Sequence, residues 1–123
     1  MHYDFVAIPE QDVPRASNPL FQYLLDTYAS ETDKVISVWR CFSPEDMSFR
    51  PHPKSSSVAE ILKHQLLSER RFFGEFVGAP EPLAADVLPK TQERSAYIQR
   101  IEELARPRLD SWIEDRKQKY FNI

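Results

Sequence analysis

The distribution of proline most constrains how this chain can fold. Its 123 residues include ten prolines and only two glycines, and most of the prolines lie between stretches with helical periodicity. Proline is tolerated in the first turn of a helix and in connections, but it interrupts a helix interior. This punctuation is typical of a helical bundle. Because a chain of this length builds one core, we expect a single helical domain over residues 1–123.

The first predicted helix follows an arm without regular structure. Residues 1–18 contain two prolines and no helical period, so we expect them to be extended. Asn18 followed by Pro19 is a favourable helix start, because asparagine caps free N–H groups and proline at the first helical position loses no needed donor. The first helix is predicted over residues 19–42. Its seam alternates spacings of four and three residues, as in bundle helices: Phe21, Leu25, Tyr28, Thr32, Val35, Trp39 and Phe42.

The second predicted helix has clear signals at both ends. An S-P-E-D motif after the first helix indicates a short capped turn. A proline-containing loop follows, and Ser57 with Glu60 then forms a capping-box pattern, in which each side chain accepts a hydrogen bond from the other residue's backbone. We therefore predict a helix over residues 58–77, with Gly78 as its left-handed end.

The third predicted helix follows a connection with three prolines, residues 79–90. It spans residues 91–117, begins at Thr91 and is kinked or broken near Pro107, which lacks an N–H group and clashes with the carbonyl four residues back. We expect the chain to end without a fourth helix. Together the patterns predict an all-α antiparallel bundle with three principal helices and an extended N-terminal arm. The third seam consists of Ile98, Ile101, Ala105, Leu109 and Trp112.

Composition argues against several classes of protein. The formal charge of −3 is nearly balanced, so it predicts no nucleic-acid partner. No apolar run approaches the roughly 20 residues that span a bilayer, and we expect no membrane association. Cys41 is the only cysteine, which favours a reducing compartment. The first residues are acidic and soon reach a proline, unlike a secretory signal, so a cytoplasmic location is expected.

The segment FSPEDMSFRPHPKSSSVAEILKHQLLSERRFFGEF resembles the DinB/YfiT-like family of four-helix bundles. In that family the second helix begins after a Pro- and Ser-containing loop and carries a metal-ligand histidine followed by an acidic residue. Ser57, His64 and Glu69 match those positions here. The resemblance implies a divalent metal held by three histidines on the first, second and last helices. It also implies thiol transfer or hydrolysis of a small molecule.

Most of that metal site has no counterpart in the sequence. The first-helix ligand would fall around Thr27 or Tyr28, and the last helix is absent, so the chain looks shortened at its C-terminus. A zinc or nickel site that activates water or a thiol needs about three protein ligands and an open position. We therefore expect no cofactor. His64 is the one candidate ligand for zinc or nickel.

The second helix also carries a candidate polar pocket. Gln65 and Glu69 fall within its apolar arc, while His64 and Ser68 lie at the margin. Buried polar groups must be paired, because leaving one unpaired costs about 1–3 kcal/mol. One interpretation is a pocket inherited from a metal site. The favoured one is a hydrogen-bonded pair four residues apart that faces the bundle or a subunit partner.

Two functional hypotheses follow. The first is a non-catalytic bundle that completes its core as a homodimer or higher oligomer, because exposed apolar area costs about 25 cal/mol per Å². An arm over residues 3–8 that covers the gap within one chain is the alternative to self-association. The second hypothesis is a metal-dependent thiol transferase or hydrolase acting on a small molecule. The expected dimer contacts, around a two-fold axis, are Phe72, Phe73, Phe76, Trp112 and Phe121.

Overall fold

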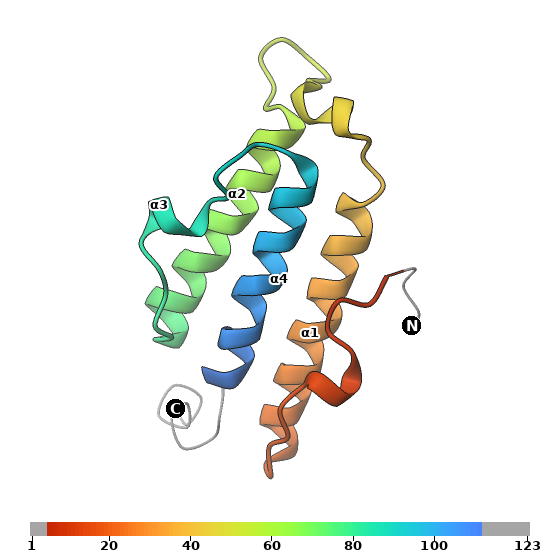
Figure 1. The fold of residues 1–123 in the computed structure, drawn as a ribbon. Helices are drawn as coiled ribbons and strands as arrows, with labels where there is room; N and C mark the ends of the chain where they lie inside the picture. The colour runs from red at the N-terminus through yellow and green to blue at the C-terminus, as the bar shows by residue number, and fades with distance from the viewer. Residues whose placement is uncertain (1–4, 112–123) are drawn as a thin grey trace.

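The computed structural model describes residues 5–111, and that part of the chain contains helices and connections but no strand (Figure 1). The predicted all-α helical bundle is confirmed. In Figure 1, α2 and α4 run in the same direction and α1 runs opposite to both. A crossover, residues 79–93, carries the chain from the end of α2 back to the start of α4. The long helices are α1 (Pro19–Trp39), α2 (Val58–Arg71) and α4 (Arg94–Ser111), and the short elements are η1 (Glu10–Asp12), η2 (Pro44–Ser48) and α3 (Ala84–Val87).

Side-chain caps begin α1 and α2 where the sequence predicts them. The Asn18 carboxamide oxygen accepts a hydrogen bond from the Leu20 N–H at 2.9 Å. At the start of α2, the Ser57 hydroxyl accepts from the Glu60 N–H at 3.2 Å, and the Glu60 carboxylate accepts from the Ser57 N–H at 3.4 Å. The predicted capping box is therefore present, and it supplies partners for N–H groups that have none inside the helix.

The end of α2 widens into a π-helical segment, η3 (Phe72–Val77). Gly78 follows with φ of 75°, so the predicted left-handed end is confirmed. The wider turn places Phe73 and Val77 in the core while the Phe72 and Phe76 side chains stay exposed. Single π-helical turns of this kind often occur at functional sites.

Helix α4 continues through Pro107 from Arg94 to Ser111. The alternative of a break near Pro107 is therefore wrong, and the predicted kink stays a prediction. Pro107 lies on the exposed face, where water can bond to the carbonyl that its missing N–H leaves free. The helix begins at Arg94 rather than at Thr91, and its predicted end at residue 117 lies outside the described residues.

The N-terminal arm packs on α1 at the side away from α2 (Figure 1). One carboxylate oxygen of the buried Asp33 accepts hydrogen bonds from the N–H groups of Ala7 and Ile8, at 2.8 and 2.9 Å. From α4, the Arg106 guanidinium donates to the Ala7 carbonyl at 3.0 Å. The described part of the arm therefore covers the edge between α1 and α4 and leaves the α1–α2 side open.

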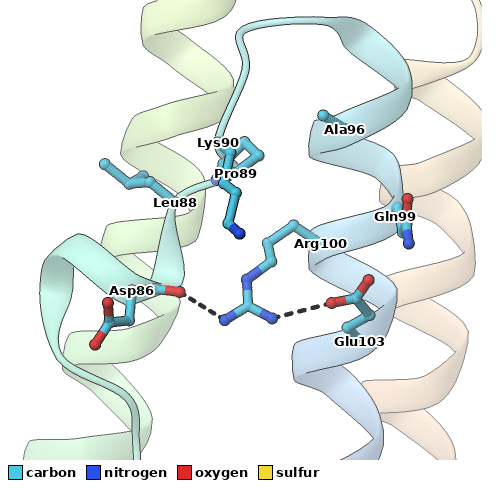
Figure 2. A pocket seen from close by; sticks show the side chains of 8 residues that line it. All are labelled: Asp86, Leu88, Pro89, Lys90, Ala96, Gln99, Arg100 and Glu103. Atoms are coloured by element: carbon cyan, nitrogen blue, oxygen red, sulfur yellow. Dashed lines mark hydrogen bonds and ion pairs between the residues drawn. The ribbon is translucent and has the colours of Figure 1, made fainter.

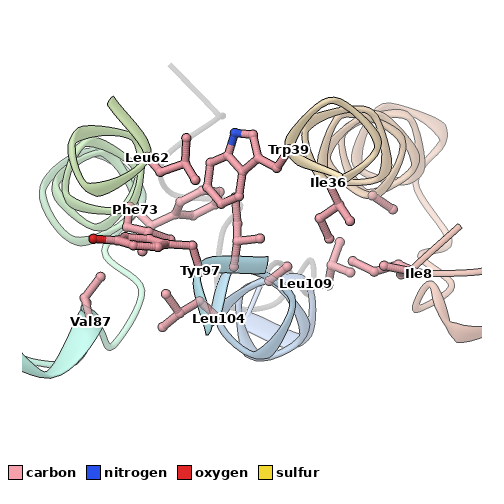
Figure 3. Packing of buried hydrophobic residues seen from close by; sticks show 14 of the residues in the cluster. Ile8, Ile36, Trp39, Leu62, Phe73, Val87, Tyr97, Leu104 and Leu109 are labelled. Atoms are coloured by element: carbon pink, nitrogen blue, oxygen red, sulfur yellow. The ribbon is translucent and has the colours of Figure 1, made fainter. Parts of the chain in front are cut away.

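The core lies among the three long helices, with Ile8 of the arm at its far edge (Figure 3). Figure 3 looks nearly along the helices and shows α4 on one side of the gap between α1 and α2, with Trp39 reaching into that gap. None of the described helices combines the length and apolar character needed to cross a membrane. Labelled members of this core are Ile36, Trp39, Leu62, Phe73, Val87, Tyr97, Leu104 and Leu109.

Candidate functional site

A buried arginine lies inside the bundle. Arg108 projects from α4, and its side chain is only 1% exposed. Its Nε and Nη2 groups donate to the two carboxylate oxygens of Glu81, at 3.1 and 2.6 Å. Glu81 belongs to the crossover, and its side chain is 7% exposed. This two-point geometry is the strongest form of an arginine–carboxylate pair, and it fixes the crossover against α4.

Arg108 also joins α1 and α2 to this pair. Its Nη1 group donates to Glu69 Oε1 at 3.1 Å and to the Tyr28 hydroxyl oxygen at 3.2 Å, and that hydroxyl donates to Glu69 Oε1 at 3.3 Å. The guanidinium carbon lies 4.9 Å from the centre of the Phe73 ring, within the range of a cation–π interaction. We call Tyr28, Glu69, Glu81 and Arg108 the arginine cluster.

The protonation of the arginine cluster follows from its contacts. Burial alone would lower the pKa of Arg108, but the hydrogen bonds that Arg108 donates to Glu81 and Tyr28 and the charge of Glu81 raise it above its ordinary value. Burial, reinforced by the charge of Glu69, raises the pKa of Tyr28. The guanidinium therefore stays charged and the phenol stays protonated at neutral pH. Tyr28 is consequently a hydrogen-bond donor here and is unsuited to act as a base.

The four polar residues predicted on the second helix separate into two pairs. The Gln65 carboxamide donates to Glu69 Oε2 at 2.7 Å, which places Gln65 beside the arginine cluster. His64 Nε2 lies 3.2 Å from the Ser68 hydroxyl oxygen, and both residues are exposed at the outer margin of α2. The structure therefore brings Gln65 and Glu69 together, as a pair four residues apart, and keeps His64 away from them.

A groove of about 340 Å³ lies between α1 and α2 beside this cluster, and we call it the α1–α2 groove. Thr27 and Tyr28, the positions where a first-helix metal ligand is expected, both line it. The surface that its lining residues expose is mostly apolar, although half of these residues have polar side chains. Small-molecule sites likewise combine apolar walls with polar groups. Apolar and aromatic side chains of the lining include Leu24, Val35, Phe72 and Phe73, and the polar ones include Glu31, Gln65 and Glu69.

The residues around the α1–α2 groove do not fit the metal site that the resemblance implies. Within residues 5–111, no three or more His, Cys, Asp and Glu side chains are grouped so that they could hold a metal ion. His64 faces outward beside Ser68, and Glu69 is already bonded to a guanidinium. A zinc or nickel site needs about three such ligands. The buried positive charge beside the α1–α2 groove is the guanidinium of Arg108.

A second arginine lines a pocket of about 450 Å³ between the crossover and α4 (Figure 2). Arg100 reaches across it and donates to the backbone carbonyls of Asp86 and Val87, at 2.6 and 3.0 Å. Its remaining nitrogen donates to Glu103 Oε2 at 3.1 Å. Figure 2 shows the guanidinium between these partners. Because each nitrogen of Arg100 is engaged, we assign it the role of holding the crossover.

The predicted dimer contacts differ in their exposure. The side chains of Phe72 and Phe76 are 48% and 68% exposed. Phe73 is only 3% exposed, and its ring centre lies 4.9 Å from that of Tyr28. We therefore assign Phe73 to the core and not to the predicted interface, because the π-helical turn directs its side chain inward. Trp112 and Phe121 lie outside the described residues.

Sequence reasoning missed Arg108 and Glu81. The helical spacing could have predicted that Arg108 is buried. It follows the buried Ile101 by seven residues and the buried Leu104 by four, which places it on the same face of the helix. A charged residue at such a position requires a partner. Glu81 had no comparable signal, since it lies in a proline-rich connection without periodicity.

Comparison with known proteins gives one family. The family model of the DinB superfamily matches residues 27–118, which is most of the chain. Searches of curated proteins and of solved structures returned no match. The matched range contains all of α2 and α4, including Ser57, His64 and Glu69. The chain belongs to the DinB superfamily.

Proposed function

We propose that this chain is a non-catalytic member of the DinB superfamily that acts through self-association, without a resident metal. The arginine cluster is the observation that carries this proposal. A covalently attached cation, Arg108, already bonds the carboxylates of Glu69 and Glu81. A divalent ion would have to displace this guanidinium, whose own burial is favourable only while both carboxylates remain bonded to it.

The surface proposed for self-association is one edge of α2 and its π-helical end. Ile61, Phe72 and Phe76 are 56%, 48% and 68% exposed, and Ser68 lies between them along the helix. At 100° per residue, Ile61, Ser68 and Phe72 fall along one edge of α2. Phe76 continues this edge, since its ring centre lies 5.8 Å from that of Phe72. We call Ile61, Ser68, Phe72 and Phe76 the α2 edge. Burying it would remove three large apolar side chains from water, at about 25 cal/mol per Å².

A second copy of the chain fits the α2 edge because the edge is complementary to itself. When two α2 helices pack antiparallel about a two-fold axis near Ser68, Ile61 of one chain lies opposite Phe76 of the partner subunit. The same operation repeats this contact on the other side of the axis. A small serine at the centre permits close approach of the helices, while the bulky side chains lie toward the ends.

Light scattering behind size-exclusion chromatography tests the proposal at micromolar concentration. The wild-type chain, of 14.4 kDa, is expected to elute with twice that mass. Phe72→Ser with Phe76→Ser should give a monomer with unchanged helix content. The matched control is Leu83→Ser, a substitution of an equally apolar and 71% exposed residue on the crossover, which should stay dimeric. A wild-type mass near 14.4 kDa, or a dimer that persists in the double variant, contradicts the proposal.

A further inference from the structure

Three aromatic residues line the α1–α2 groove, Tyr28 from α1 and Phe72 and Phe73 from the π-helical end of α2. The ring centres of Tyr28 and Phe73 lie 4.9 Å apart with 60° between their planes, and those of Phe72 and Phe73 lie 5.3 Å apart at 89°. All three residues line the groove. A ring attracts cations at its face. The Phe73 ring is buried and already carries the Arg108 guanidinium carbon at 4.9 Å, so the exposed Phe72 ring offers the accessible aromatic surface. An accessible ring beside carboxylates favours a cation with an apolar body.

Charge around the groove favours the same kind of ligand. The arginine cluster sets one guanidinium against two carboxylates, so it retains one formal negative charge next to the groove. Glu31 lines the groove from α1, is exposed, and takes part in none of the ion pairs between described residues. No Lys, Arg or His side chain is among the described lining residues. The groove is therefore an acidic and aromatic concavity.

We propose that the α1–α2 groove binds a small organic ammonium ion that carries an apolar group. The ammonium group is attracted by Glu31 and Glu69, and the apolar group packs against Leu24, Val35 and Phe72. The volume of about 340 Å³ lies at the small end of the range for ligand sites. Anions are disfavoured by the same carboxylates, and a neutral molecule of equal shape gains only the apolar contacts.

This site is separate from the proposed dimer contact, although Phe72 borders both. Glu31, Tyr28 and Glu69 line the groove and do not belong to the α2 edge. The Phe76→Ser variant should therefore bind the cation as the wild-type chain does. Binding in that variant distinguishes a failure of the dimer from a failure of the cation site.

Amide-resolved NMR titration with phenethylamine tests the inference, with 2-phenylethanol as a neutral probe of the same shape and phenylacetate as an anionic one. Phenethylamine should shift the amide signals of Thr27, Glu31 and Gln65, and the other two probes should bind more weakly. Glu31→Gln should weaken phenethylamine binding by about fivefold, with a smaller effect at high salt because exposed charges are screened. Glu31 is exposed, so this variant is expected to fold.

The matched control is Glu45→Gln, which makes the same charge change at an exposed position in η2, outside the groove. It should leave phenethylamine binding unchanged. The inference is overturned if phenethylamine and 2-phenylethanol bind equally well, if the two glutamate variants behave alike, or if no probe shifts the groove amides at millimolar concentration.

Discussion

Arg108 and Glu81 form a two-point ion pair between residues 27 positions apart in the chain, with Nη2 2.6 Å from Oε1 and Nε 3.1 Å from Oε2. Both side chains are buried. The bidentate contact fixes the crossover by geometry as well as by charge. Removal of the Arg108 side chain would leave the carboxylates of Glu69 and Glu81 poorly solvated and without their cation.

Arg108→Met is therefore expected to lower the free energy of unfolding by about 3–5 kcal/mol, the usual effect of removing one partner of a buried ion pair. Arg108→Lys should restore only part of the loss, because an ammonium cannot reproduce the planar fork that bonds both oxygens of Glu81. Urea denaturation followed by circular dichroism measures both variants.

The control for this prediction is Arg71→Met, which removes an exposed ion pair between Arg71 at the end of α2 and Glu75 in η3. Its effect should stay within about 0.5 kcal/mol, because exposed pairs contribute little. Equal effects at the two positions would show that the buried cluster is not a principal source of stability.

Purified protein is expected to carry zinc or nickel well below one equivalent, because His64 and Glu69 are not grouped with further ligands. Chelation with EDTA should leave the thermal midpoint unchanged, and His64→Ala should not alter the metal content. Mass spectrometry of metals after purification without added metal makes the measurement. Stoichiometric metal that disappears in His64→Ala would contradict this prediction and favour the metal-dependent thiol transferase or hydrolase.

Pro107→Ala is expected to stabilise the protein by about 1–3 kcal/mol. Proline is about 3 kcal/mol less favourable than alanine inside a helix, and the loss of its rigidity in the unfolded chain offsets part of the gain. The position is exposed, so the methyl group has space. Thermal and urea denaturation measure the change. A destabilised variant would show that the proline ring itself makes a contact that the helix needs.

Ser57→Ala should destabilise the fold by about 1 kcal/mol, because it removes the oxygen that caps the Glu60 N–H at the start of α2. Ser56→Ala is the matched control, since it changes the neighbouring serine outside the capping box. Urea denaturation of both variants decides the matter. Equal midpoints for the two variants would contradict the assigned cap.

The capping box also predicts a pH dependence. Hydrogen bonds from the Ser57 backbone N–H and hydroxyl lower the pKa of Glu60 below its ordinary value. A carboxyl whose pKa is lower in the folded state stabilises the fold at pH values above its pKa in the unfolded chain, which is about 4.3. This stabilisation disappears as the pH falls through the pKa of the folded state. An NMR titration of the Glu60 carboxyl should show the low pKa, and Ser57→Ala should raise it. An unchanged pKa in that variant would refute the assignment.

The parts of the fold that the sequence predicts correctly depend on contacts a few residues apart. The Asn18 cap, the Ser57–Glu60 box and the left-handed Gly78 each act within one turn of backbone. Their residue types therefore report the local structure directly. The alternative of a break at Pro107 has the same local origin: the local rule for proline is correct, but exposure of that face allows the helix to continue.

The candidate site was harder to predict because its partners are distant in sequence. The contacts from Arg108 to Glu69 and Tyr28 span 39 and 80 residues. Periodicity identifies Glu69 and Gln65 as polar residues on an apolar face, and it predicts that they need partners. It does not name the partners, since these depend on how the helices pack.

Three arginine guanidinium groups hold the crossover in place through hydrogen bonds. Arg70 from α2 donates to the Pro82 carbonyl at 2.6 Å, and Arg100 and Arg108 from α4 hold the carbonyls of Asp86 and Val87 and the carboxylate of Glu81. Dissolved guanidinium ions present the same planar donors to these oxygens, whereas urea carries no charge. In guanidinium chloride the connection between α2 and α4 should therefore loosen before the helices unfold. In urea, loosening and unfolding should coincide.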